Sequence, residues 1–230
     1  MLQSPRLSTL APWHLGTLAL WIVLLGVSVA AQYGYSDRSL GYQLPWENAR
    51  IRLNRVSVEP GASFPTAPDR VLVYMTADAT GRMPADAVWQ PAGGSALQNS
   101  GRVRVEALAI DLKDAPPIRL EGTPPEALAA PSAGASSYDG GVQVTTLVDN
   151  PRVLVAKHRY PPNTINGEVH FHPQDIVVLY LRGGYAAAAD GTWGLFRVRR
   201  GDVDVIPANT LHTLSNPGAD PLELLVVIPK

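Results

Sequence analysis

The chain has 230 residues, of which 46% are hydrophobic and 17% charged, and its formal net charge is −1. Because 19 basic residues are balanced by 20 acidic ones, no basic excess exists to neutralise phosphates, and we expect no nucleic-acid partner. Cysteine is absent, which excludes disulfides, thiolate metal ligands and a cysteine nucleophile. The 20 glycines and 21 prolines favour short strands and turns over long helices.

Residues 1–31 predict an export signal. An apolar run from Leu15 to Ala31 follows a segment in which only Arg6 is charged, and the run ends in small residues that suit signal peptidase. Because the run is 17 residues long, at the short edge of a membrane span, an uncleaved membrane anchor through residues 15–31 is the alternative. Both interpretations place the rest of the chain outside the cytoplasm, as a periplasmic, secreted or anchored protein.

Beyond residue 40 the sequence predicts an all-β protein. Short runs rich in Val, Leu and Ile are separated by Gly, Pro, Asn or Asp, and no convincing amphipathic helix is present. Run length and spacing favour a β-sandwich or barrel. The predicted strands are Arg50–Val58, Arg70–Met75, Val103–Leu112, Arg152–Tyr160, Asp175–Leu181, Leu195–Val198, Val203–Ile206 and Leu222–Ile228.

A segment rich in Pro, Ala and Ser, residues 114–140, divides these strands into two groups. Its composition is typical of a linker. We therefore expect one folded half over residues 32–113 and a second over residues 141–230.

The two halves resemble each other in sequence. Matching residues recur in the same order at offsets that grow only at turns, which is what a duplicated β-unit with loop insertions would leave. The matches are Asn48-Ala-Arg50-Ile51 with Asn150-Pro-Arg152-Val153, Glu59-Pro60-Gly61 with Pro161-Pro162-Asn163, Asp69–Tyr74 with Asp175–Tyr180, and Pro91-Ala92-Gly93 with Pro207-Ala208-Asn209.

Three of the five histidines form a candidate metal site in the second half. His170 and His172 are two residues apart, so on a strand both side chains would project from the same face. A third imidazole from a distant strand, such as that of His212, would complete a site with open coordination positions.

This second half resembles the cupin superfamily, whose motifs are G-x5-H-x-H-x3,4-E-x6-G and G-x5-P-x-G-x2-H-x3-N. The second motif is nearly complete, because only one of its positions, Asn209 in place of glycine, departs from it. The other matches are Gly201, Pro207, His212 and Asn216. Asparagine tolerates the left-handed turn conformation that glycine adopts there.

The first motif is less complete. His170 and His172 match, and Gly183 or Gly184 closes the motif. Thr164 stands at the opening glycine, and the glutamate position falls on Val177 or, with the shorter spacing, on Ile176. Neither Val177 nor Ile176 can bind a metal. Gln174 or Asp175 could reach in from the loop, although neither has the family's spacing.

The resemblance implies two cupin-like β-barrels, or jelly rolls, with a divalent transition metal on His170, His172 and His212 of the second barrel. Imidazole ligands favour Fe, Zn, Cu or Ni, and the sequence does not choose among them. The first half has no such site, since Ala96 replaces the metal-binding histidine of the second motif and no histidine occurs between residues 15 and 157.

Two functions follow from this resemblance. The first is an exported metal-dependent enzyme, a dioxygenase acting on a small enol, phenol or other chelating substrate, or an isomerase. The second is a non-catalytic small-molecule or sugar-binding protein of the cell envelope, favoured by the missing glutamate. A structural homodimer is a further alternative.

His158 and Tyr160 are the candidate catalytic residues. They are two residues apart on a predicted strand, and a neutral-range imidazole facing the barrel interior could act as acid or base. The alternative is that His158 faces solvent beside Lys157 and Arg159. Asp202 and Asp204 alternate with valines, and we expect them on the outer face of their strand.

Overall fold

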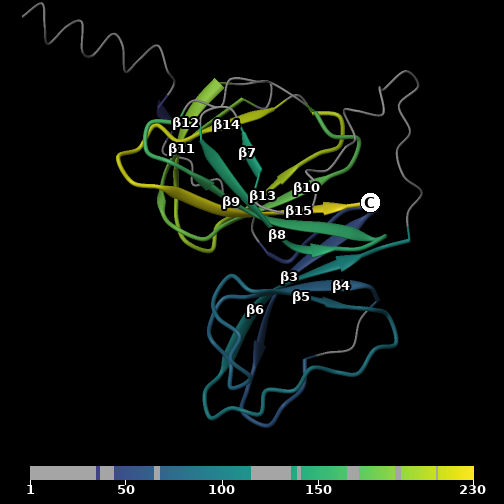
Figure 1. Cartoon of the computed structure of the whole chain (residues 1–230). Helices are drawn as coiled ribbons and strands as arrows, with labels where there is room; N and C mark the ends of the chain where they lie inside the picture. The colour runs from purple at the N-terminus through teal and green to yellow at the C-terminus, as the bar shows by residue number, and fades with distance from the viewer. Residues whose placement is uncertain are drawn as a thin grey trace, which may run out of the picture.

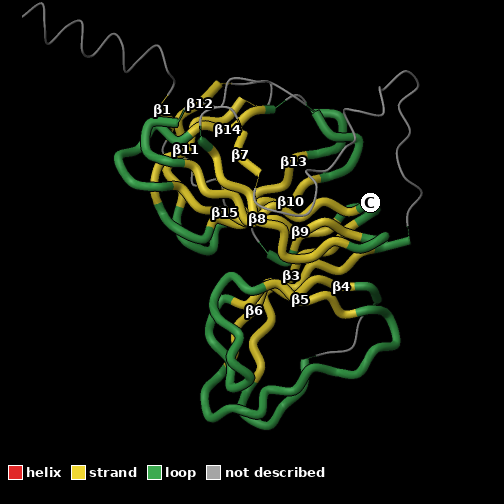
Figure 2. Tube along the Cα trace, in the orientation of Figure 1, coloured by secondary structure: helices red, strands yellow, loops and turns green. Residues whose placement is uncertain are grey.

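The computed structural model describes residues 35–36, 44–64, 68–114, 136–138, 141–164, 171–189, 193–210 and 212–230. The predicted export signal, His170 and most of the predicted linker lie outside these residues. The regular elements of the described part are all strands (Figure 2), which confirms the predicted all-β class. None of its residues forms a helix that could cross a membrane.

The strands form three sheets. The first half supplies a five-stranded sheet whose spatial order is β2 (Trp46–Glu47), β3 (Ile51–Val58), β6 (Val105–Leu112), β4 (Arg70–Tyr74) and β5 (Ala87–Gln90). The second half supplies a six-stranded sheet whose order is β13 (Val203–Ile206), β10 (Ile176–Tyr180), β15 (Leu222–Pro229), β9 (Val153–Tyr160), β8 (Val142–Asp149) and β7 (Ser136–Tyr138). The third sheet has the order β1 (Tyr35–Ser36), β12 (Trp193–Val198), β11 (Gly184–Ala189) and β14 (Thr213–Ser215).

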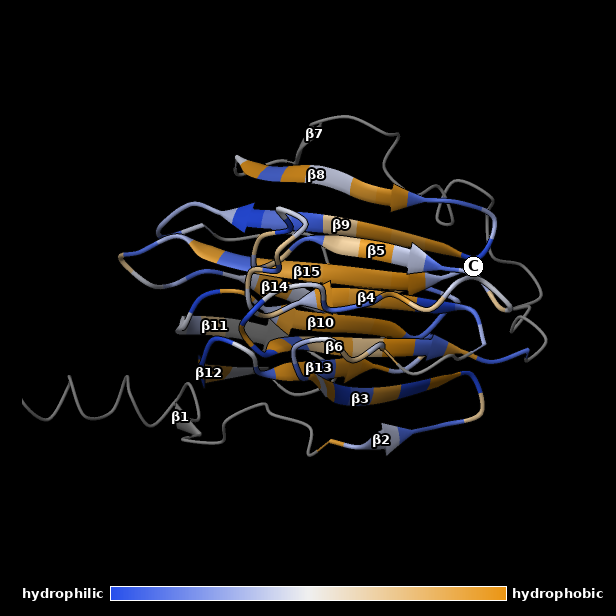
Figure 3. Ribbon diagram, turned by 90° about the horizontal axis from the view of Figure 1, so that it is seen from below, coloured by the Kyte–Doolittle hydropathy of each residue, from blue (hydrophilic) through white to orange (hydrophobic). Residues whose placement is uncertain are grey.

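All eight predicted strands are present, most with shifts of one or two residues at their ends. β10 shows why they form: its five residues are apolar or aromatic, four of them are β-branched or aromatic, and all five are buried. Figure 3 shows the same hydrophobic colouring along β10 and its neighbour β15. β7 lies within the range predicted as linker and pairs with β8 at the sheet edge.

The six-stranded sheet is buried on both of its faces. One face lines the interior of the second half's barrel, where side chains such as Ala156, Val178 and Leu224 form a core. The opposite face packs against the five-stranded sheet, and side chains such as Val177 from one half and Ile110 from the other share a second core. Figure 1 shows these two sheets lying against each other. The described residues of the first half thus form one sheet, and its other face carries a smaller core around Leu72.

The two halves repeat local hydrogen bonds at the offsets seen in the sequence. Oδ1 of Asn48 accepts bonds from the backbone N–H groups two and three residues later, at 2.8 and 2.9 Å, and Oδ1 of Asn150 does the same at 2.8 and 3.0 Å. Asp69 and Asp175 each accept a 2.9 Å bond from the backbone of a Pro-Ala turn. These matching bonds support an internal duplication.

The interface between the halves has approximate two-fold symmetry. The side-chain amide of Asn48 donates to Asp175 of the second half at 2.9 Å. Asp69 of the first half likewise accepts across the interface, from the guanidinium Nε of Arg152, which lies two residues after the counterpart of Asn48, at 2.7 Å. Asp69 and Asp175 therefore each bind the Pro-Ala turn of their own half and also a side chain of the other half.

Candidate metal centre and barrel interior

The rings of His172 and His212 lie together at one end of the second half's barrel. Their centres are 5.3 Å apart and their planes are inclined by 29°. Nδ1 of His212 lies 2.9 Å from the carbonyl oxygen of Thr210. Since a carbonyl only accepts, Nδ1 carries the proton, and in the neutral ring Nε2 holds the lone pair that a metal requires.

The loop that precedes His212 is fixed to the segment that contains His172. The backbone N–H of Asn209 donates to the carbonyl of His172 at 2.7 Å, and Asp175 accepts from Ala208 at 2.9 Å. Asn209 has a φ of 64°, so the asparagine adopts the left-handed conformation expected at this glycine position of the motif. These bonds hold the two imidazoles close together.

Asn216, the last residue of the second motif, fixes the opposite end of the same segments. It is 1% exposed, and its side-chain amide donates to the carbonyls of Tyr160, Pro161 and Asp220 at 3.2, 2.9 and 2.8 Å. Its backbone N–H also donates to the carbonyl of Thr164 at 2.9 Å. The role of Asn216 is therefore structural, and Thr164 takes part in that structure in place of the motif's glycine.

The first motif differs from the strand expected around its histidines. Phe171 and His172 are in no assigned strand, and His170 lies outside the described residues. Among the described residues, no three His, Asp or Glu side chains form a group that could hold a metal. The third ligand that the resemblance implies, His170, lies outside the residues to which this result applies.

The structure also decides which residue occupies the glutamate position. Val177 belongs to the core between the halves, so it points out of the barrel, whereas Ile176 belongs to the barrel core. Ile176 thus stands where the carboxylate would be. Asp175 is 6% exposed and binds Asn48 and Ala208, so its carboxylate supports the interface and the loop instead.

His158 and Tyr160 both face the barrel interior. The neighbours of His158 across the sheet are Val144 and Leu224, which belong to the barrel core together with Tyr160. The rings of His158 and Tyr160 stack with centres 6.4 Å apart. This arrangement excludes the alternative in which His158 faces solvent.

Tyr160 nevertheless lies at the far end of the barrel from His172. The Tyr160 carbonyl binds Asn216, whereas the His172 carbonyl binds Asn209. Four residues of β-strand span about 13 Å, which is the backbone separation expected between His212 and Asn216. Tyr160 therefore belongs to the part of the barrel core near Asn216, and the structure does not bring it to the two imidazoles.

Asp204 was expected on the outer face of its strand, and that expectation is wrong. The flanking valines, Val203 and Val205, belong to the core between the halves, and Asp204 lies opposite Val178 of the barrel core. The reason is that the first half covers the outer face of β13, so this face is apolar and the polar residue points inward. Asp204 pairs with Val178 of β10, whereas His158 is in register, through Leu224, with Tyr180 of β10. Asp204 is therefore level with a residue of β10 that is two positions closer to His172.

Other polar groups share this interior. Thr146 lies opposite Ala156, and its hydroxyl is buried with no hydrogen-bond partner among the described residues. Tyr180 is 2% exposed, and its burial, together with the nearby carboxylate of Asp204, raises the pKa of its phenol well above the usual range. A ligand in the barrel would therefore meet a neutral phenol, a hydroxyl, an imidazole and a carboxylate.

The first half provides an internal comparison for these residues. At the offsets established above, Val56 corresponds to His158, Val88 to Asp204 and Ala96 to His212. Val56 and Val88 pack against the apolar core of the first half. At these positions the second half is polar where the first half is apolar.

A comparison with protein families matches residues 156–228 to the cupin domain model. This match identifies residues 156–228, within the second half, as a cupin domain. The matched residues begin on β9 and end on β15, so they include His172, His212 and the inward-facing Asp204. A search of curated proteins gives no match.

Solved structures show that the cupin fold extends over most of the chain. A protein from Pseudomonas aeruginosa described as glyoxylate-induced has a TM-score of 0.57 and 14% identity, covering 83% of this chain and 78% of its own. A salicylate 1,2-dioxygenase from Pseudaminobacter salicylatoxidans has a TM-score of 0.57 and 12% identity, covering 84% and 76%. An oxalate decarboxylase has a TM-score of 0.51 and 16% identity, covering 79% and 69%. At these identities the likeness concerns the fold alone.

Proposed function

We propose that the chain is an exported, metal-dependent cupin oxygenase that acts on a small chelating substrate inside the second half's barrel. The pairing of His172 with His212, with the proton of His212 fixed on Nδ1 by Thr210, is the observation that carries this proposal. The metal would be Fe, Zn, Cu or Ni, with iron or copper suited to oxygen chemistry.

The histidines present fit a metal ion. Bonds of about 2.0–2.1 Å from metal to imidazole nitrogen place two rings on one metal with centres roughly 5 Å apart, close to the 5.3 Å between His172 and His212. His170 would be the third ligand. A bound metal would supply Lewis-acid binding of substrate and activation of oxygen.

The chain's own residues would orient the substrate and move its proton. Asp204 is the interior carboxylate that lies nearest along β10 to His172, so we assign it the acid–base role first, ahead of His158. Thr146 offers a buried hydroxyl to a polar substrate atom. Tyr160 would limit the space for substrate at the far end of the barrel.

The substrate class follows from charge and chelation. Three neutral ligands leave the full charge of the metal to attract an anionic substrate with two oxygen donors, such as a hydroxy acid or enol. Salicylate is the first probe, because it has this chemistry and because one structurally similar protein is a salicylate 1,2-dioxygenase. Insertion of both atoms of O2 into the substrate needs no external reductant.

The test is oxygen consumption with salicylate and related hydroxy acids by the metal-loaded full chain. We expect His212→Ala to lower turnover by more than about 100-fold, because a ligand is lost, and Asp204→Asn to lower it by about 10²-fold or more. Arg197→Gln, an exposed change on β12, is the matched control and should leave turnover unchanged. Full turnover in His212→Ala would refute the proposal.

The second candidate is a non-catalytic small-molecule or sugar-binding protein, and Ile176 in place of the glutamate favours it. In that case ligands stabilise the protein against heat even after chelation of metal. Loss of all ligand binding on chelation would exclude this candidate.

A further inference from the structure

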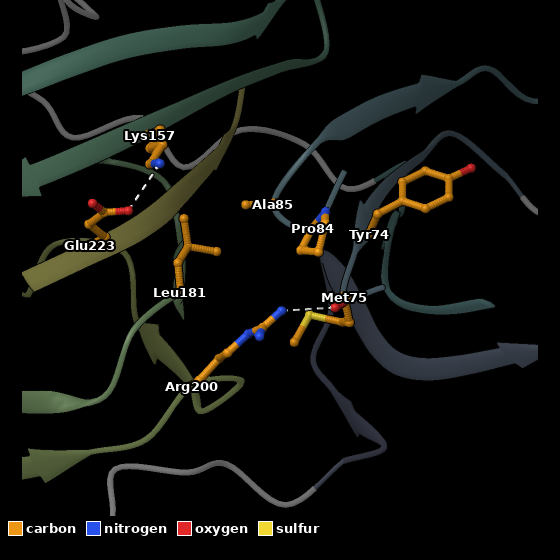
Figure 4. A pocket seen from close by; sticks show the side chains of 8 residues that line it. All are labelled: Tyr74, Met75, Pro84, Ala85, Lys157, Leu181, Arg200 and Glu223. Carbon is orange, nitrogen blue, oxygen red and sulfur yellow. Dashed lines mark hydrogen bonds and ion pairs between the residues drawn. The ribbon is translucent and has the colours of Figure 1, made fainter. Parts of the chain in front are cut away.

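A cavity of about 290 Å³ lies between the two halves, outside the barrel. The first half lines it with Met75, Pro84 and Ala85, among others, and the second half with charged residues and Leu181. Figure 4 shows these side chains on either side of the interface. Lys157, which lines this cavity, is the neighbour of His158 on β9 and points to the opposite side of the sheet.

The cavity marks a break in the two-fold symmetry of the interface. Ala85 corresponds to Gly201. The backbone N–H of Ala85 donates to the Tyr74 carbonyl and that of Gly201 to the Tyr180 carbonyl, both at 2.8 Å. Both residues have a positive φ, 78° for Ala85 and 88° for Gly201. By the same offsets Lys157 corresponds to Arg55. One pair, Arg55 and Gly201, closes its side of the interface, since the Arg55 guanidinium donates to the Gly201 carbonyl at 2.5 Å.

On the cavity side, the contact equivalent to that between Arg55 and Gly201 is replaced by an ion pair. The Nζ of Lys157 pairs with Glu223 at 3.0 Å, and the cavity is lined by Lys157 and Ala85, which correspond to Arg55 and Gly201. Lysine has a compact ammonium and lacks the planar guanidinium with which Arg55 reaches the Gly201 carbonyl on the other side of the interface. The interface therefore holds a space on one side that a side chain fills on the other.

The charges around the cavity favour an anion. Glu223 is shared between Lys157 at 3.0 Å and Arg159 at 3.4 Å, so one carboxylate faces two cations. Arg159 does not line the cavity, so its lining carries two cations, Lys157 and Arg200, and one carboxylate, Glu223. The bond of Arg200 to the Met75 carbonyl at 3.1 Å uses one of the five N–H donors of arginine. An arginine in this position can bind a carboxylate through its remaining donors.

The rest of the wall is apolar. Leu181 and Met75 are partly buried side chains packed against the core between the halves, as is Ala85. Apolar walls with a few convergent polar groups, at an interface between folded units, are typical of small-molecule sites. Ala85 also has a strained φ for a non-glycine residue, and such residues gather at ligand sites.

We propose that this cavity is a second ligand site, separate from the barrel, which binds a small organic monocarboxylate with its carboxylate on Arg200 and Lys157 and its apolar body against Met75 and Leu181. The site does not depend on a metal in the barrel. Because the ligand contacts both halves, its binding stabilises the interface.

The chain offers a direct probe, since it contains three methionines, Met1, Met75 and Met83. Benzoate is titrated into the full chain carrying ¹³C-labelled methionine methyl groups, with Met83→Leu used for assignment. We expect a saturable shift of the Met75 signal, with a dissociation constant on the order of 1 mM. The signal of Met83, which is 58% exposed, should not move.

Controls separate the charge from the apolar contact. Benzyl alcohol, a neutral analogue, should bind at least about tenfold more weakly, and Arg200→Gln and Lys157→Met should each weaken benzoate by about tenfold. Arg197→Gln is the matched arginine control and should bind normally. An unshifted Met75 at about 10 mM benzoate, equal binding of benzyl alcohol, or normal binding by both Arg200→Gln and Lys157→Met would overturn the proposal.

Discussion

At the residue scale, the contrast between Gly201 and Ala85 shows how similar backbone positions acquire different neighbours. Both have a positive φ. A Cβ on Gly201 would lie 3.3 Å from the Met75 methyl and 3.5 Å from the Arg55 guanidinium. Ala85 accommodates its methyl group because it lines the cavity. Glycine at 201 is thus required by both conformation and space.

This contrast predicts effects of different size on stability when the two residue types are exchanged. Gly201→Ala should destabilise the protein by about 1–2 kcal/mol or more, because it adds a left-handed strain and crowds Arg55. Ala85→Gly relieves strain and should change stability by less than about 1 kcal/mol. Urea denaturation of both variants measures the difference, and equal effects would show that the two sites are not distinguished as described.

The site residues were predictable only where a motif specifies them. The motif spacing predicts that His172 and His212 lie close together, and their rings do so; their role as metal ligands stays a prediction. The face of the sheet from which His158 and Asp204 project was not predictable, because the sequence does not show that both faces of the six-stranded sheet are buried. His158 lies beside charged residues and Asp204 between valines, which suggested the wrong face for Asp204.

At the element scale, the strands found from sequence are those with runs of β-branched and aliphatic residues. β11 was missed because its Gly-Tyr-Ala-Ala-Ala-Ala sequence has low β-propensity. β14 was missed because it has three residues, and β8 because polar residues interrupt its apolar ones. Such strands form because neighbours in the sheet supply their hydrogen bonds, which no local pattern records.

At the scale of the whole molecule, the two halves share one core. Fifteen buried side chains make up this core, with members from both sheets. The matched offsets predicted two related halves, but they did not predict that the described part of the first half would be one sheet packed on the barrel. That arrangement depends on long-range packing, which no local sequence pattern records.

The shared core predicts coupled stability. Ile110→Ala, at a side chain with no exposure, should lower the free energy of unfolding by about 2–5 kcal/mol. Hydrogen exchange should rise in β9 and β10 of the second half as well as in the first half, because both pack on the same core. Val103→Ala, at a residue that is 64% exposed, is the control and should change stability by less than about 0.5 kcal/mol. Faster exchange confined to the first half would contradict a shared core.

The most direct test of the account is the metal content of the purified full chain, measured by plasma mass spectrometry in the wild type and in single variants. We predict about one transition-metal ion per chain in the wild type, loss of that metal in His172→Ala and His212→Ala, and its retention in His158→Gln, whose side chain lines the barrel without being a ligand. Wild-type protein that stays largely free of metal after reconstitution, or His212→Ala protein that keeps its metal, would contradict the proposed three-histidine centre.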